Sequence, residues 1–125
     1  MRTCLVIDDS SIVRKVAGRI IASFDTATAE AASGAEGLAA AENTMPNLVL
    51  VSGNLSDMSG EDFIRRLRAL EGGAAVPVIA LLVESNLGQM TRLKRAGASG
   101  FALKPFDRMS LSMRLETYLR LAEAA

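Results

Sequence analysis

Four side chains that could do chemistry each follow a short apolar run. Asp8 and Asp9 come after the first run, Ser52 after a second and Lys104 after a third. If these runs are parallel strands, their carboxyl ends meet at one edge of a sheet, where the functional crevice of open α/β sheets lies. The sequence therefore predicts two carboxylates, one hydroxyl and one ammonium group around a single crevice.

The adjacent carboxylates of Asp8 and Asp9 limit what this crevice can bind. Two negative charges repel a phosphate unless a cation lies between them, so a flavin or nucleotide bound directly at this loop is disfavoured. Adjacent carboxylates do suit Mg²⁺, a hard cation that takes oxygen ligands and keeps several waters. The alternative, equally compatible with two residues alone, is that one aspartate caps the following helix while the other is solvated.

The composition excludes several classes of function. The chain contains no histidine, which rules out a Ser-His-Asp triad, a Cys-His pair and a histidine-based zinc site. Fourteen basic residues balance fourteen acidic ones, so no long-range field favours nucleic acid or an anionic membrane as a partner. The single cysteine, Cys4, has no disulfide partner within the chain and predicts a reducing cytoplasm. No apolar run approaches the roughly 18 residues of a membrane span.

Segments of high apolar or β-branched content predict five strands. Several of them are continuous apolar runs without polar alternation, which is typical of parallel strands covered on both faces. The predicted strands are Cys4–Ile7, Thr26–Ala31, Leu48–Val51, Val76–Val83 and Phe101–Leu103.

The segments that follow these strands predict five helices. The first has apolar residues every fourth position, at Ile12, Val16 and Ile20, as in an amphipathic helix. The others cover Ala35–Glu42, Gly60–Leu70, Leu87–Gly97 and a last helix after Asp107, with Ser59 and Asp107 as candidate caps. Alternating strands and helices over 125 residues predict a single α/β domain, residues 1–125, with a flavodoxin-like five-stranded parallel sheet in the order 2-1-3-4-5.

Five short motifs together give the chain a recognisable pattern. They resemble those of the CheY-like receiver domains of two-component phosphorelay systems, in the right order and over essentially the whole chain. The motifs are Asp8-Asp9-Ser10, Met58-x-Gly60, Pro77-Val78-Ile79, Ala96-Gly97-Ala98 and Lys104-Pro105-Phe106.

The resemblance implies a set of site residues. In that family the acidic pair binds Mg²⁺, an aspartate ending strand three accepts a phosphoryl group from a kinase histidine, and a Thr or Ser ending strand four and a lysine bind that group. Asp8 and Asp9 match the acidic pair, with Asp9 expected to contact the metal directly, and Lys104 matches the lysine. Phe101 matches the aromatic on strand five that reports the change, although it can equally be a residue that only fills core volume.

The chain departs from the family at two positions. Counting eight residues back from Gly60 places the phosphoacceptor at Ser52, and the hydroxyl position of strand four falls on Leu82. A neutral serine hydroxyl binds a hard cation weakly, and leucine offers no hydrogen-bond donor to a phosphoryl group. We therefore expect no required cofactor, weak Mg²⁺ binding at Asp8 and Asp9, and an ion pair between these carboxylates and Lys104.

These departures predict a stand-alone pseudo-receiver, which is not an enzyme and acts without phosphorylation. It would bind a sensor kinase, another response regulator or an output protein through the face formed by the fourth helix, fifth strand and fifth helix. Two alternatives remain. Ser52 could still accept a phosphoryl group with Mg²⁺, or a face bearing Arg92 and Arg95 could bind a second-messenger nucleotide.

Two further expectations concern charged residues outside the crevice. Arg65, Arg66 and Arg68 are expected on a solvated helix face. Asp57, in the loop before this helix, is expected to be a solvated loop residue rather than a substitute phosphoacceptor.

Overall fold

A computed structural model describes residues 2–124, and the side chains of residues 2–120. Within this range a five-stranded, all-parallel sheet has the order β2-β1-β3-β4-β5. This confirms the predicted flavodoxin-like fold. The strands are β1 (Thr3–Ile7), β2 (Ala27–Ala31), β3 (Leu48–Ser52), β4 (Val78–Leu82) and β5 (Gly100–Leu103).

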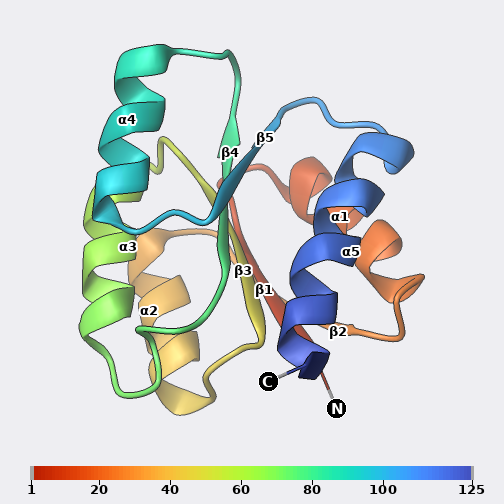
Figure 1. Ribbon diagram of the computed structural model, residues 1–125. Helices are drawn as coiled ribbons and strands as arrows, with labels where there is room; N and C mark the ends of the chain where they lie inside the picture. Colours follow the sequence, from red (N-terminus) through yellow and green to blue (C-terminus); the bar gives the residue numbers. More distant parts are fainter. Residues whose placement is uncertain (1, 125) are drawn as a thin grey trace.

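Five helices alternate with the strands in the described part of the chain, and they cover both faces of the sheet. Figure 1 shows α2, α3 and α4 on one face and α1 and α5 on the other. The helices are α1 (Ser11–Ala22), α2 (Gly34–Asn43), α3 (Gly60–Ala69), α4 (Leu87–Ala96) and α5 (Arg108–Ala124). None of the helices in the described range is long and apolar enough to cross a membrane.

The core lies in two layers because successive residues of a strand point to opposite faces. In β1, Leu5 and Ile7 join the cluster under α2, α3 and α4, whereas Cys4 and Val6 join the cluster under α1 and α5. Every residue of β3 and β4 is buried. The ends of these central strands are therefore held on both faces, which fixes the positions of the side chains that follow them.

The predicted fourth strand is too long at both ends. The sequence predicts a strand over Val76–Val83, whereas β4 begins at Val78 and ends at Leu82. Pro77 has no backbone N–H to give to a neighbouring strand, and the carbonyl of Val76 accepts a hydrogen bond from Arg68. Val83 lies beyond the sheet and is exposed.

Capping side chains define where the helices begin. Ser59 accepts a hydrogen bond from the Asp62 amide, and Asp107 accepts one from the Ser110 amide at 2.7 Å. Both predicted caps are confirmed. For α1 the cap is Ser10, whose hydroxyl accepts from the Val13 amide, so the alternative in which an aspartate caps this helix is wrong.

Candidate receiver site

Asp8 occupies the centre of the predicted crevice. The residue is buried, at 3% exposure, and both carboxylate oxygens have partners. Oδ1 accepts from the Ser10 amide at 2.9 Å, and Oδ2 accepts from the Lys104 ammonium at 2.8 Å. Asp9 instead lies exposed at the surface. Of the predicted acidic pair, Asp8 is therefore the member that contacts Lys104.

Lys104 joins the ends of three strands. Its backbone amide donates to the Leu82 carbonyl at 2.6 Å, which brings the ends of β4 and β5 together. Its ammonium group lies 2.8 Å from Asp8 Oδ2 and 3.2 Å from Ser52 Oγ. The expected ion pair of the lysine is thus present with Asp8, and the ammonium also donates to the hydroxyl at the acceptor position.

Ser52 ends β3 with its hydroxyl fully engaged. The residue is 3% exposed. Its Oγ accepts from Lys104 and from the Asn54 amide at 3.3 Å, and it donates to the Asn54 carbonyl at 3.1 Å. A hydroxyl has one donor and two acceptor sites, so these three bonds use all of them.

Leu82 fills the space beside the acceptor position. The residue is 1% exposed, and its side chain lies so close to Gly53 that a Cβ atom added there would be 2.7 Å from Leu82 Cδ2. Leu82 also lines a hollow of about 120 Å³ together with Met90, Phe101 and Arg114. Phe101 is half-buried and packs against the core cluster of this face. This agrees with the alternative in which the aromatic ring only fills core volume.

The loop between β3 and α3 is tied to α2 through Asp57. Its Oδ1 and Oδ2 accept from the amides of Gly34 and Ala35, each at 2.9 Å. The bonds from Ala35 and Gly34 hold the pKa of this carboxyl below its usual range. Asp57 is an exposed loop residue, as expected, but its carboxylate also has two backbone partners that the sequence did not predict. No sequence signal marks a contact between residues 22 or 23 positions apart.

The carboxylate of Asp8 is already engaged at the place where the sequence predicts a magnesium ion. Asp8 already accepts two hydrogen bonds, Asp9 is exposed and Ser52 is neutral. Among the described residues, no three histidine, cysteine, aspartate or glutamate side chains cluster as metal ligands. A divalent cation would need carboxylate oxygens that are free of the Lys104 ammonium.

The arginine face proposed for a nucleotide lies on α4. Arg92 Nε is 3.4 Å from Glu61 Oε2 on α3, so Arg92 already has a carboxylate partner. Arg95 is exposed. This ion pair would weaken a contact between Arg92 and a phosphate, because the phosphate would have to compete with Glu61.

Comparison with known proteins places the chain among receivers. The family model for the response regulator receiver domain matches residues 4–116. The chain is 28% identical over 113 residues to the chemotaxis protein CheY of Pseudomonas aeruginosa, which covers 90% of this chain and 91% of that protein. It is also 30% identical over 120 residues to the transcriptional regulatory protein PrrA of Mycobacterium tuberculosis, covering 95% of this chain and 50% of that protein.

Solved structures agree with this relationship. The chemotaxis response regulator CheY4 of Vibrio cholerae superposes with a TM-score of 0.89 at 25% identity, covering 94% of this chain and 98% of that one. The receiver domain of a sensor histidine kinase of Pseudomonas aeruginosa, solved with a magnesium ion in its active-site cleft, has a TM-score of 0.86 at 25% identity over 95% and 98% of the two chains. Receiver domains are generally non-enzymatic signalling modules that interact with kinases, other regulators or output domains. The fold, the motif order and the family match together show that the chain belongs to the response regulator receiver domain family of two-component signalling.

Proposed function

We propose that this receiver signals without phosphorylation, as a pseudo-receiver that acts by binding a protein partner. The observation that carries the proposal is the position of the Lys104 ammonium, which lies 2.8 Å from Asp8 and 3.2 Å from the hydroxyl of Ser52. The lysine thus already has the contacts that hold β5 against β1 and β3. No phosphoryl group is needed to draw it inward.

The two exchanged residues support this proposal for separate reasons. Ser52 is neutral at cellular pH and cannot form the acyl phosphate that a carboxylate forms. Leu82 has no hydroxyl that could bond a phosphoryl oxygen, and its side chain is packed against Gly53. Both the acceptance of a phosphoryl group and its effect on β4 are thereby weakened. The resting conformation is then set by packing and by partner binding.

Magnesium binding is proposed to be weak and not required. The related kinase receiver domain was solved with magnesium coordinated in its cleft. In this chain the same acidic loop offers Asp8, which is paired with Lys104, and Asp9, which is exposed. A cation at Asp8 would have to displace a buried ammonium group, which opposes binding.

The proposed partner surface is the α4–β5–α5 face. Large hydrophobic side chains are exposed on or beside its three elements, including Leu87 at 79% and Met109 at 74%. The others are Val83, Leu103 and Met113. Exposed apolar side chains are the kind of surface that protein partners cover, and we propose a sensor kinase, another response regulator or an output protein as the partner. The buried thiol of Cys4, whose pKa is raised by burial, fits the reducing cytoplasm that we propose as its setting.

Intact mass after incubation with Mg²⁺ and acetyl phosphate tests the proposal. The native chain, Ser52→Asp and the double variant Ser52→Asp/Leu82→Thr are compared. We expect no adduct on the native chain and an adduct on at least the double variant. The adduct on the variant shows that the phosphoryl donor is active and that the protein is folded. An adduct on the native chain that maps to Ser52 overturns the proposal and makes the chain a phosphoacceptor.

A further inference from the structure

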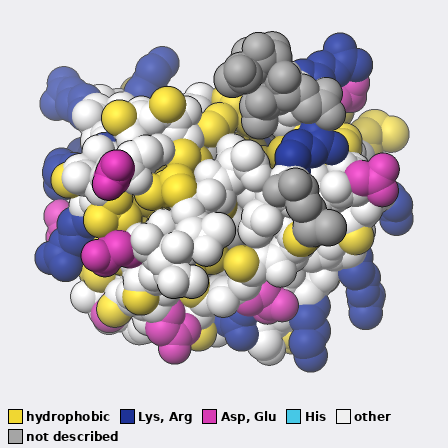
Figure 2. Space-filling model, turned by 90° about the horizontal axis from the view of Figure 1, so that it is seen from below, with side chains coloured by type: hydrophobic (Ala, Val, Ile, Leu, Met, Phe, Trp, Pro, Cys, Tyr) yellow, Lys and Arg dark blue, Asp and Glu magenta, His cyan; other side chains and the backbone are white. Residues whose placement is uncertain are grey.

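A cavity among the described residues lies at the end of the sheet opposite to the receiver site. It has a volume of about 550 Å³, within the range of small-molecule sites. Figure 2 looks onto this end and shows hydrophobic side chains gathered on its left half, the side of α2 and α3 in Figure 1. The walls include Met45, Pro46, Val76, Pro77 and Tyr118.

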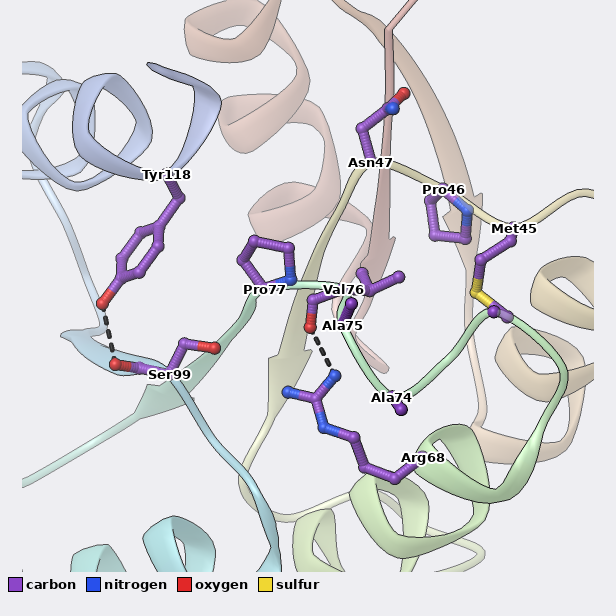
Figure 3. Close-up of a pocket in the computed structure, with 11 residues that line it drawn as sticks. Met45, Pro46, Asn47, Arg68, Ala74, Ala75, Val76, Pro77, Ser99 and Tyr118 are labelled. Carbon is purple, nitrogen blue, oxygen red and sulfur yellow. Dashed lines mark hydrogen bonds between the residues drawn. The ribbon is translucent and has the colours of Figure 1, made fainter. Parts of the chain in front are cut away.

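Arg68, near the end of α3, supplies the one charged side chain of this lining. Its Nη1 donates to the carbonyls of Gly73 and Val76, and its Nη2 donates to the Gly97 carbonyl at 2.6 Å. Figure 3 shows the guanidinium among the lining residues, with its bond to Val76. The expectation that Arg68 lies on a solvated face is wrong. The three carbonyls hold the guanidinium in a fixed position.

Within the described side chains, the charge of Arg68 has no anionic partner. Its three acceptors are neutral carbonyls, and among the described side chains no carboxylate lies within ion-pair distance of it. Partial burial lowers the pKa of the guanidinium, as expected for a cation that has lost water without gaining a counter-ion. A guanidinium has five N–H donors, so two are left after the three bonds described.

Three other polar side chains of the lining have hydrogen-bond partners within the chain. The Tyr118 hydroxyl donates to the Ser99 carbonyl at 2.7 Å, and the Ser99 hydroxyl accepts from the Val78 amide at 3.0 Å. The Asn47 side-chain oxygen accepts from the Thr3 amide. A ligand of this cavity therefore meets mainly apolar walls and one cation.

We propose that this cavity binds a small monocarboxylate with an apolar body. The carboxylate would accept from the free N–H groups of Arg68, a charge-assisted contact, while the apolar body packs against Met45, Val76 and Pro77. The single guanidinium selects one negative charge. Because this site lies at the amino ends of β3 and β4, it is independent of Ser52 and of the proposed pseudo-receiver function.

Amide ¹H–¹⁵N spectra of the native chain, titrated with 3-phenylpropionate, test the site. The neutral 3-phenylpropanamide is the matched control for the apolar body. We expect 3-phenylpropionate to shift the amides of Gly73, Ala75 and Ser99 and to bind at least tenfold more tightly than the amide. The absence of shifts at these residues, or equal binding of the two compounds, overturns the proposal.

Two variants separate the roles of charge and space. Arg68→Gln removes the cation, and Ala75→Trp fills the cavity from an exposed position of the lining while leaving Arg68 intact. Each is expected to weaken 3-phenylpropionate binding at least tenfold. Arg65→Gln on the same helix is the control, because Arg65 is exposed and paired with Asp62, and it should leave binding unchanged. If Arg68→Gln does not fold, Ala75→Trp decides, and unaltered binding by Ala75→Trp contradicts the site.

Discussion

The ammonium group of Lys104 lies 2.8 Å from Oδ2 of Asp8, and the two side chains are only 16% and 4% exposed. They come from opposite ends of the chain, 96 residues apart, and meet because the strands they follow are parallel. A buried ion pair of this kind need not be more stable than an apolar pair, but removing one partner leaves an uncompensated charge. Single and double variants of the two residues can therefore test the ion pair.

Lys104→Met keeps the length of the side chain and removes its charge. We expect the free energy of unfolding at pH 7 to fall by about 3 kcal/mol, because Asp8 remains buried and charged. Urea denaturation measures the change. The double variant Asp8→Asn/Lys104→Met leaves no unpaired buried charge and should recover most of the lost free energy of unfolding. A change below about 0.5 kcal/mol in the single variant, the size of an ordinary surface substitution, would show that the pair is solvated.

Gly53→Ala tests the packing of Leu82 beside the acceptor position. The added Cβ would lie 2.7 Å from Leu82 Cδ2 and 2.8 Å from Gln89 Nε2. Gln89 is flexible, but Leu82 is buried, so we expect a loss of about 1–3 kcal/mol in urea denaturation, as for an overpacked core. Replacing Leu82 by the smaller threonine should reduce this loss in Gly53→Ala/Leu82→Thr.

Gly88→Ala is the control for this experiment. A Cβ at Gly88 would meet its nearest neighbours at 3.4 and 3.5 Å, which is close to ordinary contact. The substitution lies in α4, where alanine is favoured over glycine, so stability should be unchanged or slightly higher. If Gly53→Ala behaves like Gly88→Ala, Leu82 is not packed against Gly53.

The carboxyl of Asp57 should titrate below its usual range. The amides of Ala35 and Gly34 bond to its charged form and lower its pKa in the folded state. Its contribution to stability is therefore fully present above the unfolded-state pKa of about 3.9, and is lost as the pH falls through the lower folded-state value. Carboxyl ¹³C shifts measure the titration directly.

Asp57→Asn supplies the comparison for the pH dependence. The variant should lose stability at pH 7 and show a shallower decline than the native chain below about pH 4, because the titrating group is gone. The urea midpoint, followed from pH 7 to pH 2.5, gives both curves. Parallel curves for the two proteins would mean that Asp57 does not tie the loop to α2.

Magnesium should distinguish the native chain from a variant with the acceptor carboxylate restored. Ser52→Asp adds a carboxylate near Lys104 and Asp8, and we expect Mg²⁺ to raise the thermal midpoint of this variant through binding to the folded state. The native chain should show little change under the same conditions. A matched rise in both proteins would indicate a cation site that does not involve position 52.

The sequence was sufficient for the fold and for the edge of the sheet at which the site residues meet. Continuous apolar runs such as Leu48–Val51 identify buried parallel strands, and parallel strands bring Asp8, Ser52 and Lys104 to one edge without further information. The sequence did not predict that Asp8 is buried and Asp9 exposed, since the directions of adjacent side chains are set by the loop backbone.

Contacts made by loops were the part that the sequence did not predict. Asp57 bonds to the first turn of α2, and Arg68 bonds to carbonyls of two separate segments. Charged residues beside helices are usually solvated, and a pattern of residue types carries no sign that a particular backbone group lies within reach. These contacts depend on the conformation of the connecting loops.

The amide ¹H–¹⁵N spectrum of the native chain, recorded before and after addition of Mg²⁺ and acetyl phosphate, tests the central claim most directly. We expect the amides of α4, β5 and α5 to keep their positions, because Ser52 accepts no phosphoryl group and Leu82 cannot respond to one. Ser52→Asp/Leu82→Thr should show shifts in these elements under the same conditions. Shifts across α4 and β5 in the native chain, with a phosphoryl adduct on Ser52, would contradict the account and identify a receiver that phosphorylation still switches.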